Sequence, residues 1–241
     1  MADIRTIGVL AYENCSEQDT ITPLEIFRGA AMALDQRLKI LPPDGPPTKL
    51  DVKLVSVAKG NVRMQMGTEV VPDELLDDRQ SFDIFFVPGG VGAGAMTRND
   101  NVLAAIRRHY QSGKIVASNC SGVGVLCRAG ILGQTPVTCV AAIARRLREL
   151  GANVPQPRMM WQGVPDARIW TATGSYGVHG GAAAIVAHYF GRTVVTTIGM
   201  MFDTLGGLGE TLYKTVGPEF FYHPDLEKTF QDFWEDQLLP K

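Results

Sequence analysis

The sequence predicts an α/β protein of the doubly wound kind, in which a mostly parallel sheet carries helices on both faces. Short apolar runs rich in β-branched residues alternate along the chain with segments whose apolar residues recur at helical spacing. The 241 residues can bury a sizeable core, and 45% of them are hydrophobic. We find no internal repeat and no sign of a second domain, so we expect residues 1–241 to form a single domain.

The first half of the chain predicts a central strand followed by a helix and further strands. Residues 4–11 are apolar and β-branched, which is typical of a buried strand, and a polar loop follows at 12–18. Pro23 marks a helix start, and the helical stripe runs to about Gln36. The next expected elements are a surface connection at 41–47, a strand at 50–57, two short strands within 62–71 and a strand at 82–87.

The second half continues the same alternation. Apolar residues between 102 and 110 predict a helix on which His109 takes an exposed face. The later expected elements are a strand ending near 119 with a helix after it, a helix at 140–151, strands at 159–161 and 168–172 with a Gly-Val-Pro-Asp turn between them, and a small-residue helix at 177–187. From about residue 200 we expect a helical extension with one apolar face, made of Leu226, Phe230, Phe233, Trp234 and Leu238.

Composition limits the classes of partner. The 23 basic and 25 acidic side chains give a net charge of −2 and form no basic cluster, which argues against nucleic acid. No apolar run approaches the roughly 20 residues of a membrane-spanning helix, and the first residues do not resemble a signal peptide. The four cysteines have neither metal-ligand spacing nor a disulfide pattern, so we expect a cytoplasmic protein with reduced thiols and no metal.

Cys120 is the strongest candidate for chemistry. An apolar strand ends at this residue and turns at once into a helix through small residues. Such a turn holds one side chain in a strained bend at the carboxyl edge of a parallel sheet. The following helix directs unpaired N–H groups and its positive dipole end at the sulfur, which favours the thiolate. An ordinary buried strand would need neither Asn119 nor Ser121, so we interpret Cys120 as a nucleophile and the cysteines after it as structural thiols.

A glycine pair, Gly89 and Gly90, follows the strand at 82–87. Ligands of doubly wound proteins sit beyond the carboxyl ends of the strands. Glycines at that place leave backbone N–H groups uncovered, able to donate to charge that develops on a substrate. No Gly-Lys-Ser/Thr follows, so the segment does not match a phosphate-binding loop.

Together these motifs resemble the DJ-1/PfpI superfamily. The resemblance covers roughly residues 4–200 and rests on Val-Pro-Gly-Gly at 87–90 and on Ala-Ser-Asn-Cys-Ser-Gly at 117–122. It implies a flavodoxin-like fold and a homodimer. In the first loop of the family, an acidic residue lies four positions before a proline and faces the cysteine sulfur; here that residue is Asp19.

The residues around the cysteine resemble the isocyanide (isonitrile) hydratase branch of the superfamily. In the protease-like and glyoxalase-like branches a histidine follows the cysteine, and the first-loop acid is glutamate. Here Ser121 follows Cys120 and the acid is Asp19. The resemblance implies a cofactor-independent hydro-lyase that adds water to a small electrophile, such as an isocyanide, to give an N-substituted formamide. The expected catalytic residues are Cys120, Asp19 and Ser121, with Gly89 and Gly90 holding the developing charge.

Departures from that branch leave other functions open. The branch carries Thr-His where this chain has Thr138-Cys139, and an Asp near Gly180. His179, in a glycine-rich turn, is the best histidine candidate for a base near the sulfur, and Tyr176 is a candidate pocket residue. The alternatives are another cysteine lyase or hydrolase that tailors a larger metabolite, a redox sensor or chaperone-like protein, and the ligand-sensing domain of a regulator. The last is disfavoured because nothing after residue 200 resembles a helix-turn-helix.

Overall fold

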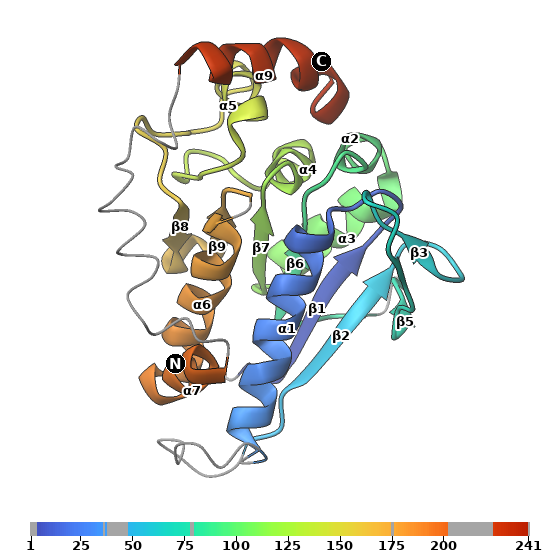
Figure 1. The fold of residues 1–241 in the computed structure, drawn as a ribbon, viewed down its shortest axis with the longest axis vertical. Coiled ribbons are helices and arrows are strands. Elements are labelled where there is room, and N and C mark those ends of the chain that lie inside the picture. Colours follow the sequence, from blue (N-terminus) through green and yellow to red (C-terminus); the bar gives the residue numbers. More distant parts are fainter. Residues whose placement is uncertain are drawn as a thin grey trace.

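A computed structural model describes residues 4–35, 37, 48–77, 80–174, 176–201 and 224–240. The strands of its main sheet are β1 (Thr6–Ala11), β2 (Asp51–Ser56), β5 (Glu74–Leu75), β6 (Ile84–Val87), β7 (Ile115–Asn119), β8 (Trp161–Val164) and β9 (Ile169–Ala172). They lie in the order β5-β2-β1-β6-β7-β9-β8 (Figure 1). Every neighbouring pair is parallel except β8 with β9. The predicted mostly parallel sheet is therefore confirmed.

Helices cover both faces of this sheet. They are α1 (Glu17–Leu34), α2 (Ala93–Met96), α3 (Asp100–Gln111), α4 (Gly122–Ala129), α5 (Ala141–Glu149), α6 (Tyr176–Phe190), α7 (Arg192–Met201) and α9 (Pro224–Leu238). Helix α1 packs with α6 and α7 in front of the sheet, and α3 packs with α4 behind it (Figure 1). The core lies between these layers, with β6 buried along its whole length.

Two short strands, β3 (Val62–Arg63) and β4 (Glu69–Val70), form an antiparallel pair outside the main sheet, as predicted for 62–71. Strand β8 begins where the sequence predicted a strand to end, because Gly163 and Val164, expected in the turn, pair with β9 instead. The turn itself is a short 3-10 segment, Pro165–Ala167. The connection expected at 41–47 lies outside the described residues.

Helix α1 starts earlier than the sequence predicted. Ser16 caps its N-terminus by accepting a hydrogen bond from the backbone N–H of Asp19 at 3.4 Å. Glu17 and Asp19 stand in the first turn, where the helix dipole favours carboxylates. Pro23 consequently lies inside the helix instead of at its start. Asp19 is therefore held on a helical backbone.

The exposed position expected for His109 is wrong. Its side chain is 1% exposed and stacks on the Phe85 ring, with 4.6 Å between ring centroids. Its Nε2 accepts the backbone N–H of Phe82 at 3.1 Å, which leaves Nδ1 to donate to the Ala105 carbonyl at 2.7 Å. Burial lowers the pKa of His109. This histidine is a satisfied core residue.

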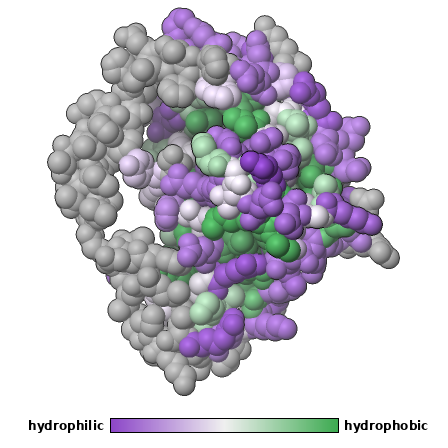
Figure 2. All heavy atoms as spheres, turned by 45° about the vertical axis from the view of Figure 1, so that its right-hand side comes forward, coloured by the Kyte–Doolittle hydropathy of each residue, from purple (hydrophilic) through white to green (hydrophobic). Residues whose placement is uncertain are grey.

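The C-terminal helix packs on α5 (Figure 1). Of the apolar face predicted for it, Leu238 is buried and Trp234 is half-buried. The side chains of Leu226, Phe230 and Phe233 lie outside the described residues. The face of the molecule in Figure 2 is largely hydrophilic, with smaller apolar areas between the polar groups. Among the described helices, none has the length and apolar character needed to cross a membrane.

Candidate active site

The site lies where the sheet order reverses. From β1 the chain moves outward to β2 on one side, and then returns to place β6 on the other side. Ligands of doubly wound folds bind at such a switch point, beyond the carboxyl ends of the strands. Because β1, β6, β7 and β9 are parallel, the segments that follow them meet at one edge. Those segments carry Tyr12, the loop 88–90, Cys120 and Gly174.

Cys120 occupies the strained bend between β7 and α4. Its φ is 51°, in the left-handed region that residues with a side chain rarely adopt. The bend is held by a hydrogen bond from the Cys120 N–H to the Ala172 carbonyl at 2.9 Å. A Cβ on Gly122 would lie 2.4 Å from the Pro88 carbonyl oxygen, so the turn needs glycine there. The residue as a whole is half-buried.

The carboxyl group of Asp19 faces this thiol. The side chain is 3% exposed, and the carboxyl and the Cys120 sulfur are hydrogen-bonded to each other. Burial raises the pKa of Asp19 to about 6, although the hydrogen bonds with Cys120 and Ser16 act in the opposite direction. The structure thus brings together the acid and the sulfur that the sequence paired.

The sequence predicted that the helix after the bend would favour the thiolate, but the thiol of Cys120 holds its proton more strongly than an ordinary cysteine. Burial raises the pKa of Cys120 well above its ordinary value, and the charge of Asp19 raises it further. The backbone N–H of Ser121 lowers it by hydrogen bonding, but this acts against the larger effects. Near neutral pH the two acidic groups therefore hold one proton between them, and they titrate as a pair. The sulfur becomes a thiolate when Asp19 takes the proton.

The two loop glycines do not leave their N–H groups uncovered. The N–H of Gly89 donates to Asn119 Oδ1 at 2.9 Å, and the N–H of Gly90 donates to Ser121 Oγ at 3.0 Å. The Ser121 hydroxyl in turn donates to the Gly90 carbonyl at 2.8 Å. The polar residues on either side of Cys120 therefore fasten the loop to the bend. In this arrangement neither glycine N–H is available to a developing negative charge, which corrects the sequence expectation.

Glycines are nevertheless required around the sulfur for reasons of space. A Cβ on Gly89 would lie 2.5 Å from the Cys120 Cβ and 2.7 Å from Asp19 Oδ2. A Cβ on Gly174 would lie 3.1 Å from the Cys120 sulfur. The backbone therefore closes on the reactive pair from two strands, and a side chain at either position would displace the sulfur or the acid.

Tyr12 belongs to the same cluster, although the sequence assigned it to a polar loop. It is fully buried, and its hydroxyl donates to the Pro88 carbonyl at 2.6 Å. Burial raises the pKa of Tyr12 well above its ordinary value, and the charges of Cys15, Asp19 and Cys120 raise it further. The sequence did contain one indication of this position: Tyr12 directly follows β1, and the residues after parallel strands lie at the carboxyl edge of the sheet.

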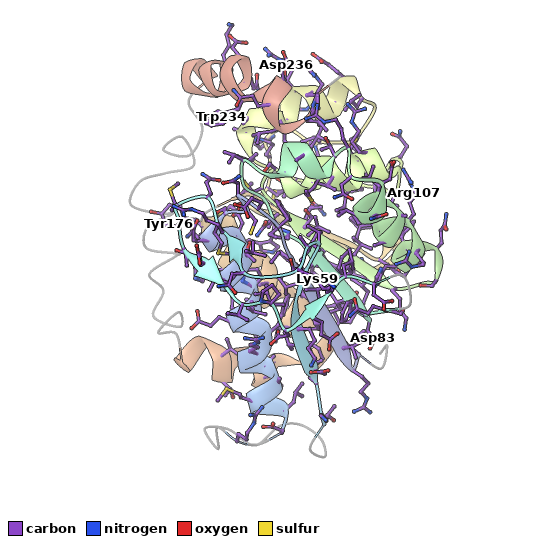
Figure 3. All side chains as sticks on the ribbon, turned by 90° about the vertical axis from the view of Figure 1, so that its right-hand side faces the viewer. Lys59, Asp83, Arg107, Tyr176, Trp234 and Asp236 are labelled. Atoms are coloured by element: carbon purple, nitrogen blue, oxygen red, sulfur yellow. The ribbon has the colours of Figure 1, made fainter. Side chains whose placement is uncertain are left out.

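The two candidate pocket residues are both exposed on helix α6. Tyr176 begins α6 and is 61% exposed (Figure 3). His179 is exposed on the same helix, which replaces the predicted turn. Neither residue contributes to the shifted pKa of Cys120. Their proposed place beside the sulfur remains a prediction.

The other cysteines stand apart from this chemistry. Cys15 and Cys139 are buried and Cys127 is half-buried, and all are reduced. Within the described residues, no group of three or more His, Cys, Asp or Glu side chains is arranged to hold a metal ion. Two surface hollows stand out, one beside α3 and the other at the opposite edge of the sheet, and neither is lined by Cys120.

Comparison with known proteins finds sequence matches between part of this chain and two enzymes. An isonitrile hydratase of Pseudomonas putida is 30% identical over 113 residues, which are 47% of this chain and 48% of that protein. A deglycase of Thermococcus kodakarensis is 29% identical over 105 residues, 43% of this chain and 63% of that protein. The matches thus span less than two thirds of either relative.

Solved structures share the whole fold. A ThiJ/PfpI family protein from Pseudomonas syringae superposes with a TM-score of 0.73, at 18% identity, over 99% of this chain and 91% of that one. DJ-1 of Schizosaccharomyces pombe gives 0.66 at 14% identity, over 84% and 99%. Residues 5–185 match the DJ-1/PfpI family. This chain belongs to the DJ-1/PfpI family.

Proposed function

We propose that the protein is a cysteine-dependent hydratase that adds water to a small electrophile such as an isocyanide. The observation that carries the proposal is the buried carboxyl of Asp19, hydrogen-bonded to the Cys120 sulfur, with a pKa of about 6. A carboxyl tuned to this range can both accept and deliver a proton near neutral pH. The match to an isonitrile hydratase supports this choice of electrophile.

The reaction begins with transfer of the shared proton from Cys120 to Asp19. The thiolate attacks the terminal carbon of the isocyanide, and Asp19 delivers its proton to that carbon, which gives a thioimidate. The backbone N–H of Ser121 stabilises negative charge on the sulfur.

The second half of the reaction uses Asp19 as the base. Its carboxylate accepts a proton from water as the oxygen adds to the thioimidate carbon. Asp19 then passes this proton to the nitrogen. As the carbon–sulfur bond breaks, the hydroxyl of the adduct gives up its proton to the Asp19–Cys120 pair and becomes the carbonyl of the released N-substituted formamide. The sum is addition of one water molecule to one isocyanide, and the pair regains its single proton.

The direct test is to incubate the protein with a model isocyanide and to quantify the formamide by chromatography. Cys120→Ala should reduce product formation to the uncatalysed level while the circular dichroism spectrum stays unchanged. Cys127→Ala is the matched control, because Cys127 is a partly exposed cysteine on α4 and should be dispensable. Full activity in Cys120→Ala would remove this mechanism.

A second candidate is a different cysteine enzyme of the same family, and the similarity to a deglycase favours it. The same pair would then attack the carbon of an adduct between a small aldehyde and an amine or thiol. Supplying such an adduct in parallel with the isocyanide, and following release of the free amine or thiol, separates the two reactions. Assembly as a homodimer also remains a prediction.

A further inference from the structure

Helix α1 has a gap in its hydrogen bonding at Asp19. Pro23 lies inside the helix and has no N–H, so the carbonyl four residues earlier receives no hydrogen bond from it. That carbonyl belongs to Asp19. It accepts instead from the side chain of Asn119, whose Nδ2 lies 2.9 Å away, although the two residues are a hundred positions apart in the chain.

The other end of the same amide is also engaged. Asn119 Oδ1 accepts the N–H of Gly89 at 2.9 Å, and the residue is 0% exposed. A carbonyl on one side and an N–H on the other fix the orientation of the amide, because only one of its two ends can donate. Burying an amide is costly unless it is paired, so this side chain is stable only while both neighbours stay in place.

We propose that Asn119 is a positioning residue, whose amide ties the Asp19 backbone to Gly89 and so sets where the Asp19 carboxyl stands against the Cys120 sulfur. Asn119 immediately precedes the nucleophile on β7. One side chain therefore links the three segments that build the site: the first turn of α1, the loop after β6 and the bend. Its value for turnover rests on the proposed function, whereas its effect on Asp19 does not.

Other groups around Asp19 are also fixed. Ser16 caps the N-terminus of α1, and the Tyr12 hydroxyl donates a hydrogen bond to the Pro88 carbonyl in the loop after β6. The titratable groups that interact with this cluster are the Cys120 thiol, the Tyr12 hydroxyl and the Cys15 thiol. None of these groups bonds the Asp19 carbonyl, so removing the amide loosens the acid without removing any of them.

The test measures the titration midpoint of the Asp19 carboxyl. Carbon NMR of protein labelled at the aspartate carboxyl groups follows it, and the signal is assigned by its loss in Asp19→Asn. In Asn119→Leu, which keeps the volume and removes the amide, Asp19 gains contact with water. Burial is the largest influence on the pKa of Asp19, so its midpoint should fall by about one pH unit even though the hydrogen bond with Cys120 is weakened. Asn119→Ala provides a second variant if the leucine side chain disturbs folding.

Ser118→Ala is the matched control. Ser118 is the preceding residue of β7, is 1% exposed and donates to the Val87 carbonyl at 2.7 Å. Its loss removes a buried hydrogen bond between β6 and β7 but leaves the Asp19 carbonyl untouched. The midpoint of Asp19 should stay at the wild-type value in this variant.

Rescue provides the decisive comparison. Pro23→Ala restores a backbone N–H that can donate to the Asp19 carbonyl within the helix. The double variant Pro23→Ala with Asn119→Leu should therefore recover most of the fall in the midpoint. An unchanged midpoint in folded Asn119→Leu and Asn119→Ala would overturn the proposal. So would an equal fall in Ser118→Ala, or an equal fall in the double variant, because the amide would then not act through this carbonyl. Isocyanide turnover is measured separately, so failure of the proposed function would not alter these outcomes.

Discussion

Asp19 and Glu235 are carboxyl groups buried to the same degree, 3% and 4% exposed, in very different surroundings. Glu235, on α9, accepts the Arg146 backbone N–H at 2.9 Å and lies 3.0 Å from a guanidinium nitrogen of Arg145. Asp19 interacts with a thiol, and its pKa is set by burial and by hydrogen bonds with Cys120 and Ser16, none of which supplies a positive charge. Because a buried charge without a cation is expensive, Asp19 retains a proton to higher pH. The comparison shows how similar burial yields a carboxyl that keeps its proton to higher pH in one region and a structural clamp in the other.

The clamp joins two helices through several ion pairs. Arg146 is buried and reaches both Glu235 and Asp236, which is labelled on α9 in Figure 3. The residues just beyond α9 continue onto α4, the helix that follows Cys120, where Leu239 lies against Gly124. The C-terminal clamp therefore packs against the helix next to Cys120, although only the region around Cys120 takes part in the proposed chemistry.

The largest expected effect comes from Asp19→Asn, which removes the titrating group but keeps its shape. The rate of formamide formation should fall by about 10²- to 10⁴-fold, because the amide can neither accept nor deliver the proton. Steady-state kinetics measures this loss, and thiol-reagent titration should show that Cys120 still reacts. A near-normal rate would reduce Asp19 to a helix-terminal carboxylate.

The same chemical change at Glu235 should affect stability instead of rate. Glu235→Gln leaves the buried Arg146 short of its counter-charge, and the free energy of unfolding should fall by about 3 kcal/mol. Urea denaturation measures this change, and the turnover of the folded enzyme should be unaltered. Lys228→Ala is the control, since this exposed lysine pairs with the exposed Asp232 and its loss should leave the urea midpoint unchanged. If Glu235→Gln and Lys228→Ala lowered the free energy of unfolding equally, the buried pair of Glu235 and Arg146 would contribute no more to stability than an exposed ion pair.

A smaller effect follows from the raised pKa of Asp19. Its folded pKa of about 6 exceeds the ordinary value of 3.8, so the folded state binds more protons than the unfolded state between these values. Wild-type stability should therefore decline as the pH rises from about 4 to about 6, through this one group. Asp19→Asn removes the decline and should be more stable than wild type at pH 7 by about 2 kcal/mol. Urea titrations at pH 4 and pH 7 test the sign: the difference between the two proteins should vanish at the lower pH.

The sequence predicted the elements that have a local signature. The apolar strand, the cysteine and the small residues after it lie within ten positions of each other, and they form the bend that was expected. The pairing of Asp19 with Cys120 could be predicted only through resemblance to a family, since the two residues are 101 positions apart in the chain.

The remaining features depend on contacts between distant segments. Asn119 and Ser121 looked like signs of catalysis, yet their side chains satisfy the N–H groups of Gly89 and Gly90. The burial of His109 depends on aromatic rings that approach from β6 and from the residues just before it. Helical periodicity cannot reveal which neighbours close over a residue, so such assignments follow only from the folded arrangement.

The order in which the chain threads through the sheet has a consequence for its synthesis. The acid emerges from the ribosome long before the sulfur, and the two meet only after β1, β6 and β7 have aligned side by side. Until then, Cys120 is an ordinary thiol without a proton partner. The arrangement of the acid against the sulfur, and with it the raised pKa of Cys120, is therefore set by completion of the sheet itself.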